Sequence, residues 1–251
     1  MVNAGRDVVL SELRERIERL ERGGRKRAVL PFGVAALDKH LPGNGLALGA
    51  VHEFMEAGAA SEHSACAALF AAGILARLKG PVLWCLKSRD LFAPALASVG
   101  LHPDRVIYAE TSRGSEILPA VEEGLRHRGL AGVVGEVARL GLTPSRRLQL
   151  AAEETGVPAH LIRRWRNDAE RASGAEPSAA TTRWRVTAAP SRALPAPGIG
   201  RERWLVELIR CKGAEASAWT LEACDAKGRL ALPADVADRS LPQELQRRTA
   251  A

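Results

Sequence analysis

The sequence predicts an α/β fold: a doubly wound, mainly parallel sheet with antiparallel edge strands and an N-terminal helical arm. Between residues 50 and 162, short apolar segments alternate with helical patterns, as in parallel sheets whose strands are joined by helices. After residue 182, apolar and polar residues alternate, which suits antiparallel strands added at a sheet edge. Before residue 28, a charged segment carries an apolar stripe at helical spacing.

The composition sets limits on the size and the partners of the protein. The chain has 251 residues, of which 46% are hydrophobic, enough for one sizeable core with appendages. Its formal net charge is +7, and a basic chain favours a polyanion or an acidic protein as its partner. Aromatic residues make up only 4% of the chain, which limits any platform for stacking nucleic-acid bases.

The sequence also predicts a cytoplasmic protein with no membrane span and no bound metal. It contains no apolar run of about 18 residues, the length typical of a membrane-spanning helix, and its first residues lack the apolar region of a secretory signal. The four cysteines show no C-x-x-C spacing, so we expect buried thiols rather than a metal site. They are Cys66, Cys85, Cys211 and Cys224.

Residues 1–27 predict a helix followed by a basic linker. Leu10, Leu13, Ile17 and Leu20 follow one another at spacings of 3, 4 and 3 residues, which places them on one side of a helix. So short a helix is marginal alone in water and must dock on its own core or on a partner. We expect Leu13, Ile17 and Leu20 to bind a partner or another copy of the chain; docking on the same core is the alternative.

The predicted core covers residues 28–235, where strands and helices alternate. The apolar residues of segment 50–55 predict a buried strand, and helical spacing of apolar residues predicts a helix over 63–78. The same reasoning gives further strands at residues 81–86, 105–109, 130–134 and 159–162, further helices at 91–99, 116–127 and 144–155, and edge strands at 183–187, 204–210 and 219–223.

Two stretches of the core predict mobile loops. Residues 166–182 are rich in Ala, Ser, Glu and Arg without an apolar period, and residues 188–201 contain several prolines and glycines. Beyond the core, residues 236–251 form a predicted polar tail. The predicted domain organisation is therefore an arm, one core with two loops, and a tail.

The segment from the first long strand into its helix has the context of a phosphate-binding loop. Such a loop needs glycines, a Lys for the phosphate charge and a Ser or Thr for magnesium. Here Glu56, Gly58 and Ser61 lie in the loop, Glu62 replaces the Lys, and His63 replaces the Ser or Thr. Two unit charges about 4 Å apart interact by roughly 4 kcal/mol, so reversing one sign costs up to roughly 8 kcal/mol. A helix N-terminus offers an anion only about 1 kcal/mol.

The sequence therefore predicts a nucleotide-binding scaffold that has lost its nucleotide chemistry, with no cofactor and no catalytic residue. The alternative is an ordinary turn from a strand to a helix, with Ser61 as the N-cap.

The order of motifs resembles the RecA family and, within that superfamily, the ImuA-type inducible mutagenesis proteins of bacteria. The resemblance covers about residues 8 to 235 and rests on the segments 32–38, 45–53, 96–106 and 203–210. It implies a RecA-like fold, induction by DNA damage in the SOS response, and a role in error-prone translesion DNA synthesis. It also implies two partners, an ImuB-type inactive Y-family polymerase homologue and an error-prone replicative-type DNA polymerase.

The chain differs from a working RecA-type ATPase at the phosphate loop and also at two other positions of the site. Gly135 stands where the magnesium-associated Asp at the end of the fourth strand would be, and a register slip of one residue would place Glu136 there instead. After the second strand, Lys87, Ser88 and Arg89 lack the Glu that would activate water. The resemblance therefore implies a protein that does not hydrolyse ATP.

Arginines beside tryptophans are the remaining candidate contacts. Arg163, Arg164, Trp165 and Arg166 run into the first predicted loop, and we expect them to contact DNA or a protein partner. Trp184 and Trp204, which are also flanked by arginine, lie in strand patterns, so we expect them to point into the core. Direct DNA binding by such residues would be weak, electrostatic and independent of sequence.

The leading hypothesis is a non-catalytic binding protein of a translesion polymerase complex. RecA and single-stranded DNA are further partners considered, as is another copy of the chain. Two alternatives stay open: a DNA-dependent ATPase of the recombinase type, and a cell-division inhibitor like SulA, which shares the RecA-like core. The length of 251 residues fits a SulA-like chain less well.

Overall fold

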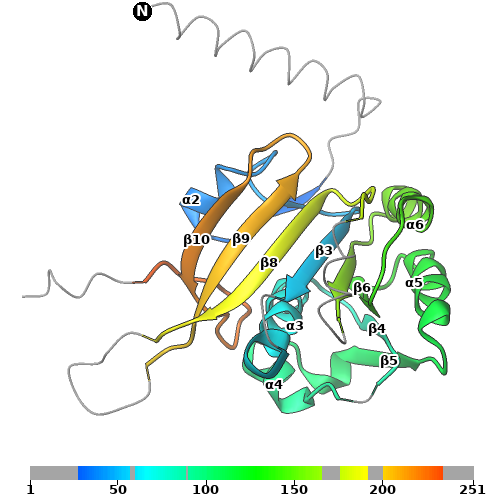
Figure 1. Cartoon of the computed structure of the whole chain (residues 1–251), viewed down its shortest axis with the longest axis horizontal. Coiled ribbons are helices and arrows are strands. Elements are labelled where there is room, and N and C mark those ends of the chain that lie inside the picture. Colours follow the sequence, from blue (N-terminus) through cyan, green and yellow to red (C-terminus); the bar gives the residue numbers. More distant parts are fainter. Residues whose placement is uncertain (1–27, 57–59, 89, 166–175, 192–199, 234–251) are drawn as a thin grey trace, which may run out of the picture.

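The computed structural model describes residues 28–56, 60–88, 90–165, 176–191 and 200–233 (Figure 1). The predicted N-terminal arm with Leu13, Ile17 and Leu20, the loop residue Gly58, the candidate contact Arg166 and the polar tail lie outside these residues. For residues 60–64, the description covers the backbone but not the side chains.

An eight-stranded sheet forms the centre of the molecule, in the order β10-β9-β8-β3-β7-β6-β4-β5. Its strands are β3 (Val51–Glu56), β4 (Val82–Leu86), β5 (Val106–Glu110), β6 (Gly132–Val137), β7 (Ala159–Arg163), β8 (Thr182–Ala189), β9 (Arg203–Cys211) and β10 (Ser217–Glu222). A small antiparallel sheet pairs β1 (Val29–Leu30) with β2 (Leu46–Ala47).

The helices cover both faces of the central sheet. They are α2 (Ala35–Asp38), α3 (Ala60–Ala76), α4 (Ala93–Ser98), α5 (Ile117–Leu125) and α6 (Leu142–Thr155), with short 3-10 turns η1 (Pro103–Arg105) and η2 (Gly114–Glu116). In Figure 1, α5 and α6 lie on one side of the sheet, whereas α3 and α4 lie on the other. The predicted RecA-like, doubly wound α/β fold is therefore confirmed, and each predicted strand and helix of the core is present.

One expectation about the edge strands is wrong in part. Strands β8, β9 and β10 are antiparallel to one another, but β8 runs parallel to β3, with Thr182 opposite His52 and Val186 opposite Glu56. Strand β7 ends where the other parallel strands end, whereas β8 begins at the opposite end of the sheet, beside the start of β3. Strand β8 is therefore the sixth strand of the parallel set, after β5, β4, β6, β7 and β3. Within this sheet only β9 runs in the opposite direction, because β10 is antiparallel to β9.

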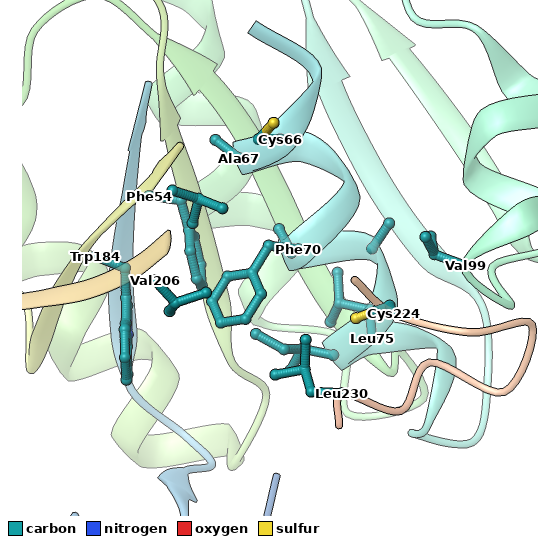
Figure 2. Packing of buried hydrophobic residues seen from close by; sticks show 14 of the residues in the cluster. Phe54, Cys66, Ala67, Phe70, Leu75, Val99, Trp184, Val206, Cys224 and Leu230 are labelled. Atoms are coloured by element: carbon teal, nitrogen blue, oxygen red, sulfur yellow. The ribbon is translucent and has the colours of Figure 1, made fainter. Parts of the chain in front are cut away.

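The core under α3 is built around Phe70. Its ring lies 5.8 Å from Phe54 and 5.9 Å from Trp184, measured between ring centroids (Figure 2). The rings of Phe32 and Trp204 lie 5.8 and 6.2 Å away. Both tryptophans are fully buried, which confirms the expectation that they point inward. This cluster anchors the edge strands β8 and β9 to α3, because aromatic side chains bury large areas and pack edge to face.

Two further predictions from the sequence concern the burial of the cysteines and the absence of a membrane-spanning helix. Cys66, Cys85 and Cys224 are buried free thiols, and Cys211 is half-buried. Burial raises the pKa of the Cys85 and Cys224 thiols to about 12, which keeps them protonated. Among the described residues, no helix is long and apolar enough to cross a membrane.

Candidate functional site

Four parallel strands bring their carboxyl ends to one edge of the sheet. Strands β3, β7, β6 and β4 are adjacent and parallel, so Glu56, Arg164, Glu136 and Asp90, at or just beyond their ends, meet there. Helix α4 follows β4 on one face and α6 follows β6 on the other. Open α/β sheets bind their ligands at such a reversal point, outside the carboxyl ends of the strands.

Arg164 is the cation at the centre of this edge. Its Nη1 and Nη2 donate to the two carboxylate oxygens of Asp90 at 2.7 Å each, and Nη1 also donates to Oε2 of Glu136 at 2.8 Å. The other oxygen of Glu136 accepts a hydrogen bond of 2.8 Å from the Trp84 indole. The hydrogen bonds that Arg164 donates to Asp90 raise the pKa of Arg164, and they lower the pKa of Asp90. Two carboxylates of the chain itself therefore neutralise this arginine.

A third carboxylate, Glu56, lies behind the pair. It is 5% exposed, and its Oε1 lies 4.0 Å from Nε of Arg164 without a hydrogen-bond partner in the described part of the chain. Burial raises the pKa of Glu56 to about 7; Arg164 opposes this shift, and Glu136 and Asp90 add to it. Glu56 therefore changes its charge near neutral pH.

A pocket of about 580 Å³ opens beside Arg164. Its walls include Lys87, Ser88, Arg139 and Trp165, and a second hollow of about 120 Å³ continues between α3 and α4. The Trp165 indole nitrogen is buried without a hydrogen-bond partner among the described residues. Lys87 and Arg139 stand at the exposed rim. In the described part of the chain, no cluster of His, Cys, Asp or Glu is arranged to hold a metal ion.

The phosphate-loop positions occupy the expected place. Glu56 ends β3, and Ser61, Glu62 and His63 lie in the first turn of α3, as the strand–turn–helix pattern predicts. The side chains of these three residues are not described, and Gly58 lies outside the described residues. The sign of the charge at Glu62 is therefore known from the sequence, and Glu56 adds a second carboxylate to the same turn.

Gly135 is not the position of a lost carboxylate. A Cβ at Gly135 would lie 2.6 Å from Cγ2 of Val121 in α5 and 3.1 Å from a methyl group of Leu161, so this residue faces the α5 side. Successive strand residues point to opposite faces, and Glu136 accordingly faces Trp84 and Arg164. The structure thus places a carboxylate at the end of β6 one residue later than the alignment with Gly135 implied.

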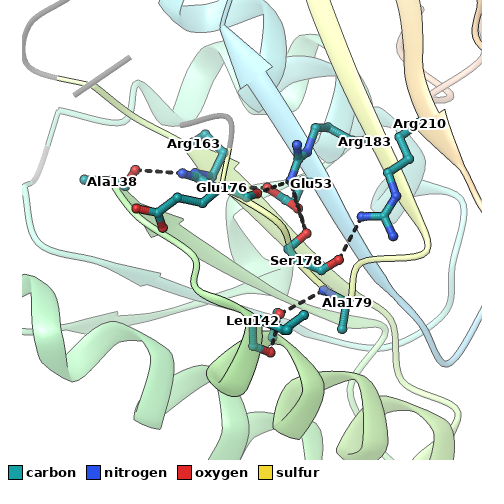
Figure 3. Close-up of polar contacts among 10 residues, drawn as sticks. Glu53, Ala138, Leu142, Arg163, Glu176, Ser178, Ala179, Arg183 and Arg210 are labelled. Atoms are coloured by element: carbon teal, nitrogen blue, oxygen red, sulfur yellow. Dashed lines mark hydrogen bonds and ion pairs between the residues drawn. The ribbon is translucent and has the colours of Figure 1, made fainter. Parts of the chain in front are cut away.

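The expectation that Arg163 contacts DNA or a partner does not fit the structure, because its side chain is fully buried. Its Nη1 lies 2.9 Å from the carboxylate of Glu53, which is also fully buried, and its Nη2 donates to the Ala138 carbonyl at 3.1 Å (Figure 3). A fully buried Arg163 is therefore not a contact for DNA or a partner. Arg164 and Trp165 remain in the candidate site, although Arg164 is occupied by carboxylates.

Besides Arg163, the buried Glu53 binds two further side chains that the sequence did not indicate. Arg183 in β8 donates to it at 3.0 Å, and the Ser178 hydroxyl also donates to it. Arg210 in β9 binds the Ser178 carbonyl at 2.7 Å, so the segment before β8 is tied to both neighbouring strands (Figure 3). A carboxylate within an apolar strand is the signal that could have found this network, because a buried charge requires a partner.

The chain was also compared with known proteins. It is similar to Protein ImuA of Caulobacter vibrioides strain NA1000 / CB15N and to Protein ImuA of strain ATCC 19089 / CIP 103742 / CB 15 of the same species. Each is 38% identical over 207 residues, which cover 79% of this chain and 84% of the relative. The chain belongs to the ImuA family. A search of protein-family profiles finds no match.

ImuA membership confirms the resemblance found in the sequence and supports involvement in inducible mutagenesis. Family membership also helps to interpret the carboxyl edge, the place where the carboxyl ends of β3, β7, β6 and β4 meet. In this ImuA-family chain, the edge keeps the shape of a ligand crevice, but carboxylates surround its central cation. An incoming phosphate would compete with Asp90 and Glu136 for Arg164 and would be repelled by both.

Proposed function

We propose that this ImuA-family protein is a non-catalytic RecA-like accessory protein of DNA-damage-induced mutagenesis. In this proposal it acts in the cytoplasm in error-prone translesion synthesis, by binding partners of a polymerase complex. The partners are those implied by the family resemblance: an ImuB-type inactive polymerase homologue and an error-prone replicative-type polymerase.

The observation that carries the proposal is the pairing of Arg164 with Asp90 and Glu136. In a working nucleotide site, cations at this edge bind phosphate. Here the chain supplies its own anions at 2.7 and 2.8 Å, and the buried Glu56 adds a third carboxylate. Replacing one of these charges by phosphate requires breaking charge-assisted hydrogen bonds, each worth about 1.5–3 kcal/mol.

Loss of nucleotide chemistry leaves the crevice free for another use. Pockets of about 580 and 120 Å³ with mixed walls offer space for side chains of a protein partner, and apolar residues such as Leu69 and Phe92 line the smaller one. Phe92 is 68% exposed, and an exposed aromatic side chain beside a hollow is typical of a protein-binding surface.

Co-purification tests the proposal. The tagged full-length chain is co-expressed with the ImuB-type protein and washed either with magnesium ATP or after enzymatic removal of all nucleotide. We expect the complex to survive both washes equally, since no nucleotide takes part. Phe92→Asp should weaken the complex at least tenfold, as expected when a hot spot worth about 1.4 kcal/mol or more is lost.

Leu150→Asp is the matched control, because Leu150 is similarly exposed, at 66%, but lies on α6, on the other face of the sheet. A complex that forms only with ATP, or one unaffected by Phe92→Asp but lost with Leu150→Asp, would contradict the proposed role of the crevice. DNA-stimulated release of phosphate by the purified chain would instead favour a recombinase-type ATPase.

A further inference from the structure

Another hollow, separate from the two beside Arg164, is lined by cations. It encloses about 500 Å³ between the segment after β1, the end of α3 and the turn of residues 225–229. Arg77, Lys227 and Arg229 line it, together with Leu30 and Leu230. Since Arg77 directly follows α3, which has 17 residues and a length of about 25 Å, this hollow lies at the opposite end of the helix from Glu56.

These three cations form no ion pair with a carboxylate of the described residues, although the charges of Asp38 and Asp225 act on Arg77 and Arg229 from a longer distance. None of them lies within 4.0 Å of a carboxylate oxygen in the described part of the chain, although Arg77 donates to the Pro31 carbonyl. The nearest acidic side chains are turned to the backbone instead. Asp38 accepts from the amides of residues 32 and 33 at 2.6 and 2.9 Å, and Asp225 accepts from those of residues 227 and 229 at 2.8 and 2.9 Å.

Two of these cations, Arg77 and Arg229, also repel each other. Burial lowers the pKa of Arg77, the charge of Asp38 partly offsets this, and the nearby Arg229 lowers the pKa further. Positive charges held together without an ion pair make the site favourable for an anion, because a bound anion removes their mutual repulsion.

The carboxyl end of α3 does not account for all of these cations. Cations often lie at helix carboxyl ends, where they bind the last carbonyl groups. Arg105 already does so here, since its guanidinium donates to the carbonyls of Ala76, Leu78 and Gly80. Lys227 and Arg229 lie on a separate turn, and among the described residues their side chains bind neither these carbonyl groups nor a carboxylate.

We propose that Arg77, Lys227 and Arg229 form a binding site for the phosphodiester backbone of nucleic acid. Guanidinium groups bind phosphate oxygens through paired hydrogen bonds, and lysine adds a point charge. A protein partner would need an exposed apolar centre. Leu230 and Phe32, the larger apolar groups here, are 7% and 2% exposed, so the accessible surface is cationic. Contacts to phosphate carry no sequence information, so the binding should not depend on base sequence. Among the described lining residues, no exposed aromatic ring is present for base stacking.

Titration of a fluorescent oligothymidylate tests this proposal. Affinity for the full-length chain is measured between about 50 and 200 mM salt for the wild type and for Lys227→Ala with Arg229→Ala. Both residues are exposed, so the variant should fold, and an unchanged melting temperature checks this. Each single-strand phosphate contact contributes about 0.7 to the salt slope, so we expect the slope to fall by about 1.4. Lys227→Arg with Arg229→Lys should restore binding.

Arg126→Ala with Arg147→Ala is the matched control, since it also removes two charges but from arginines that already pair with Glu122. The proposal predicts that this control keeps its salt slope. If the salt slope fell equally in both variants, the effect would come from net charge alone, and the proposed site would be wrong. Unchanged binding in the Lys227/Arg229 variant would place the contact elsewhere. Tighter binding of polyglutamate than of the oligonucleotide, with the same dependence on the site, would assign it to an acidic protein and overturn the proposal as well.

Discussion

Arg163 and Arg164 are neighbours in the chain, but their guanidinium groups lie on opposite faces of the sheet and bind different carboxylates. Arg163 binds the buried Glu53 at 2.9 Å, on the α6 side, and Arg164 binds Asp90 at 2.7 Å, on the α3 side. The alternation of a strand thus separates a structural ion pair from the candidate site. The two arginines should respond differently to mutation.

Breaking the buried pair should strongly destabilise the fold. Glu53→Gln leaves Arg163 and Arg183 without their counter-charge in the interior, which should lower the free energy of unfolding by about 3–5 kcal/mol. Urea unfolding measures the change. Glu207→Gln is the control, because its partner Arg185 is 43% exposed and an exposed pair contributes below about 1 kcal/mol. Similar small losses in both variants would show that the buried network is not required.

Glu56 should make stability depend on pH near neutrality. Its pKa rises from 4.5 to about 7 on folding, so the folded state binds the proton more tightly than the unfolded chain. Its contribution is present in acid and is lost as the pH rises through about 7. Relative to Glu56→Gln, the wild type should lose about 1–3 kcal/mol between about pH 4.5 and 8.

His160 has an opposing effect on stability, which cancels when the free energy of unfolding of Glu56→Gln is subtracted from that of the wild type at each pH. Burial lowers the pKa of His160 well below 6.5, so its contribution is lost as the pH falls instead. Urea unfolding across this range is the measurement. Parallel stability curves for wild type and variant would mean that Glu56 titrates as it does in the unfolded chain.

Restoring an aspartate at Gly135 should damage the fold without creating a magnesium site. A side chain there would meet Val121 and Leu161, so Gly135→Ala should cost about 1–3 kcal/mol, and Gly135→Asp more, because it also buries a charge. Gly129→Ala is the control, with no atom within 4 Å of the added Cβ, and should change stability by less than about 0.5 kcal/mol. Magnesium-dependent stabilisation of Gly135→Asp would contradict the assignment of this position to the α5 face.

The N-terminal stripe stays a prediction, because Leu13, Ile17 and Leu20 lie outside the described residues. Leu13→Asp with Ile17→Asp should lower the oligomer mass or weaken partner binding while leaving the melting temperature nearly unchanged. Light scattering and thermal unfolding provide the two measurements. A large drop in melting temperature would instead show that the helix packs on its own core.

The sequence predicted the order of strands and helices because each core element carries its own apolar period, as at Phe70 and Ile74 in α3. It did not predict the direction of β8, which depends on where a long connection returns to the sheet. It also could not pair Arg163 with Glu53, 110 residues away, or Arg164 with Asp90, 74 residues away. Such partners depend on strand order and register, and a shift of one residue exchanges the faces.

Nucleotide binding tests the central claim, that the chain's own carboxylates occupy the cation at the carboxyl edge. Calorimetric titration of magnesium ATP into the purified protein should show no saturable binding stronger than about 1 mM. Asp90→Asn with Glu136→Gln frees Arg164 and should increase the affinity for ATP or for inorganic triphosphate. Saturable micromolar binding of magnesium ATP to the wild type, with turnover that stops when Arg164 is replaced by Ala, would contradict the account.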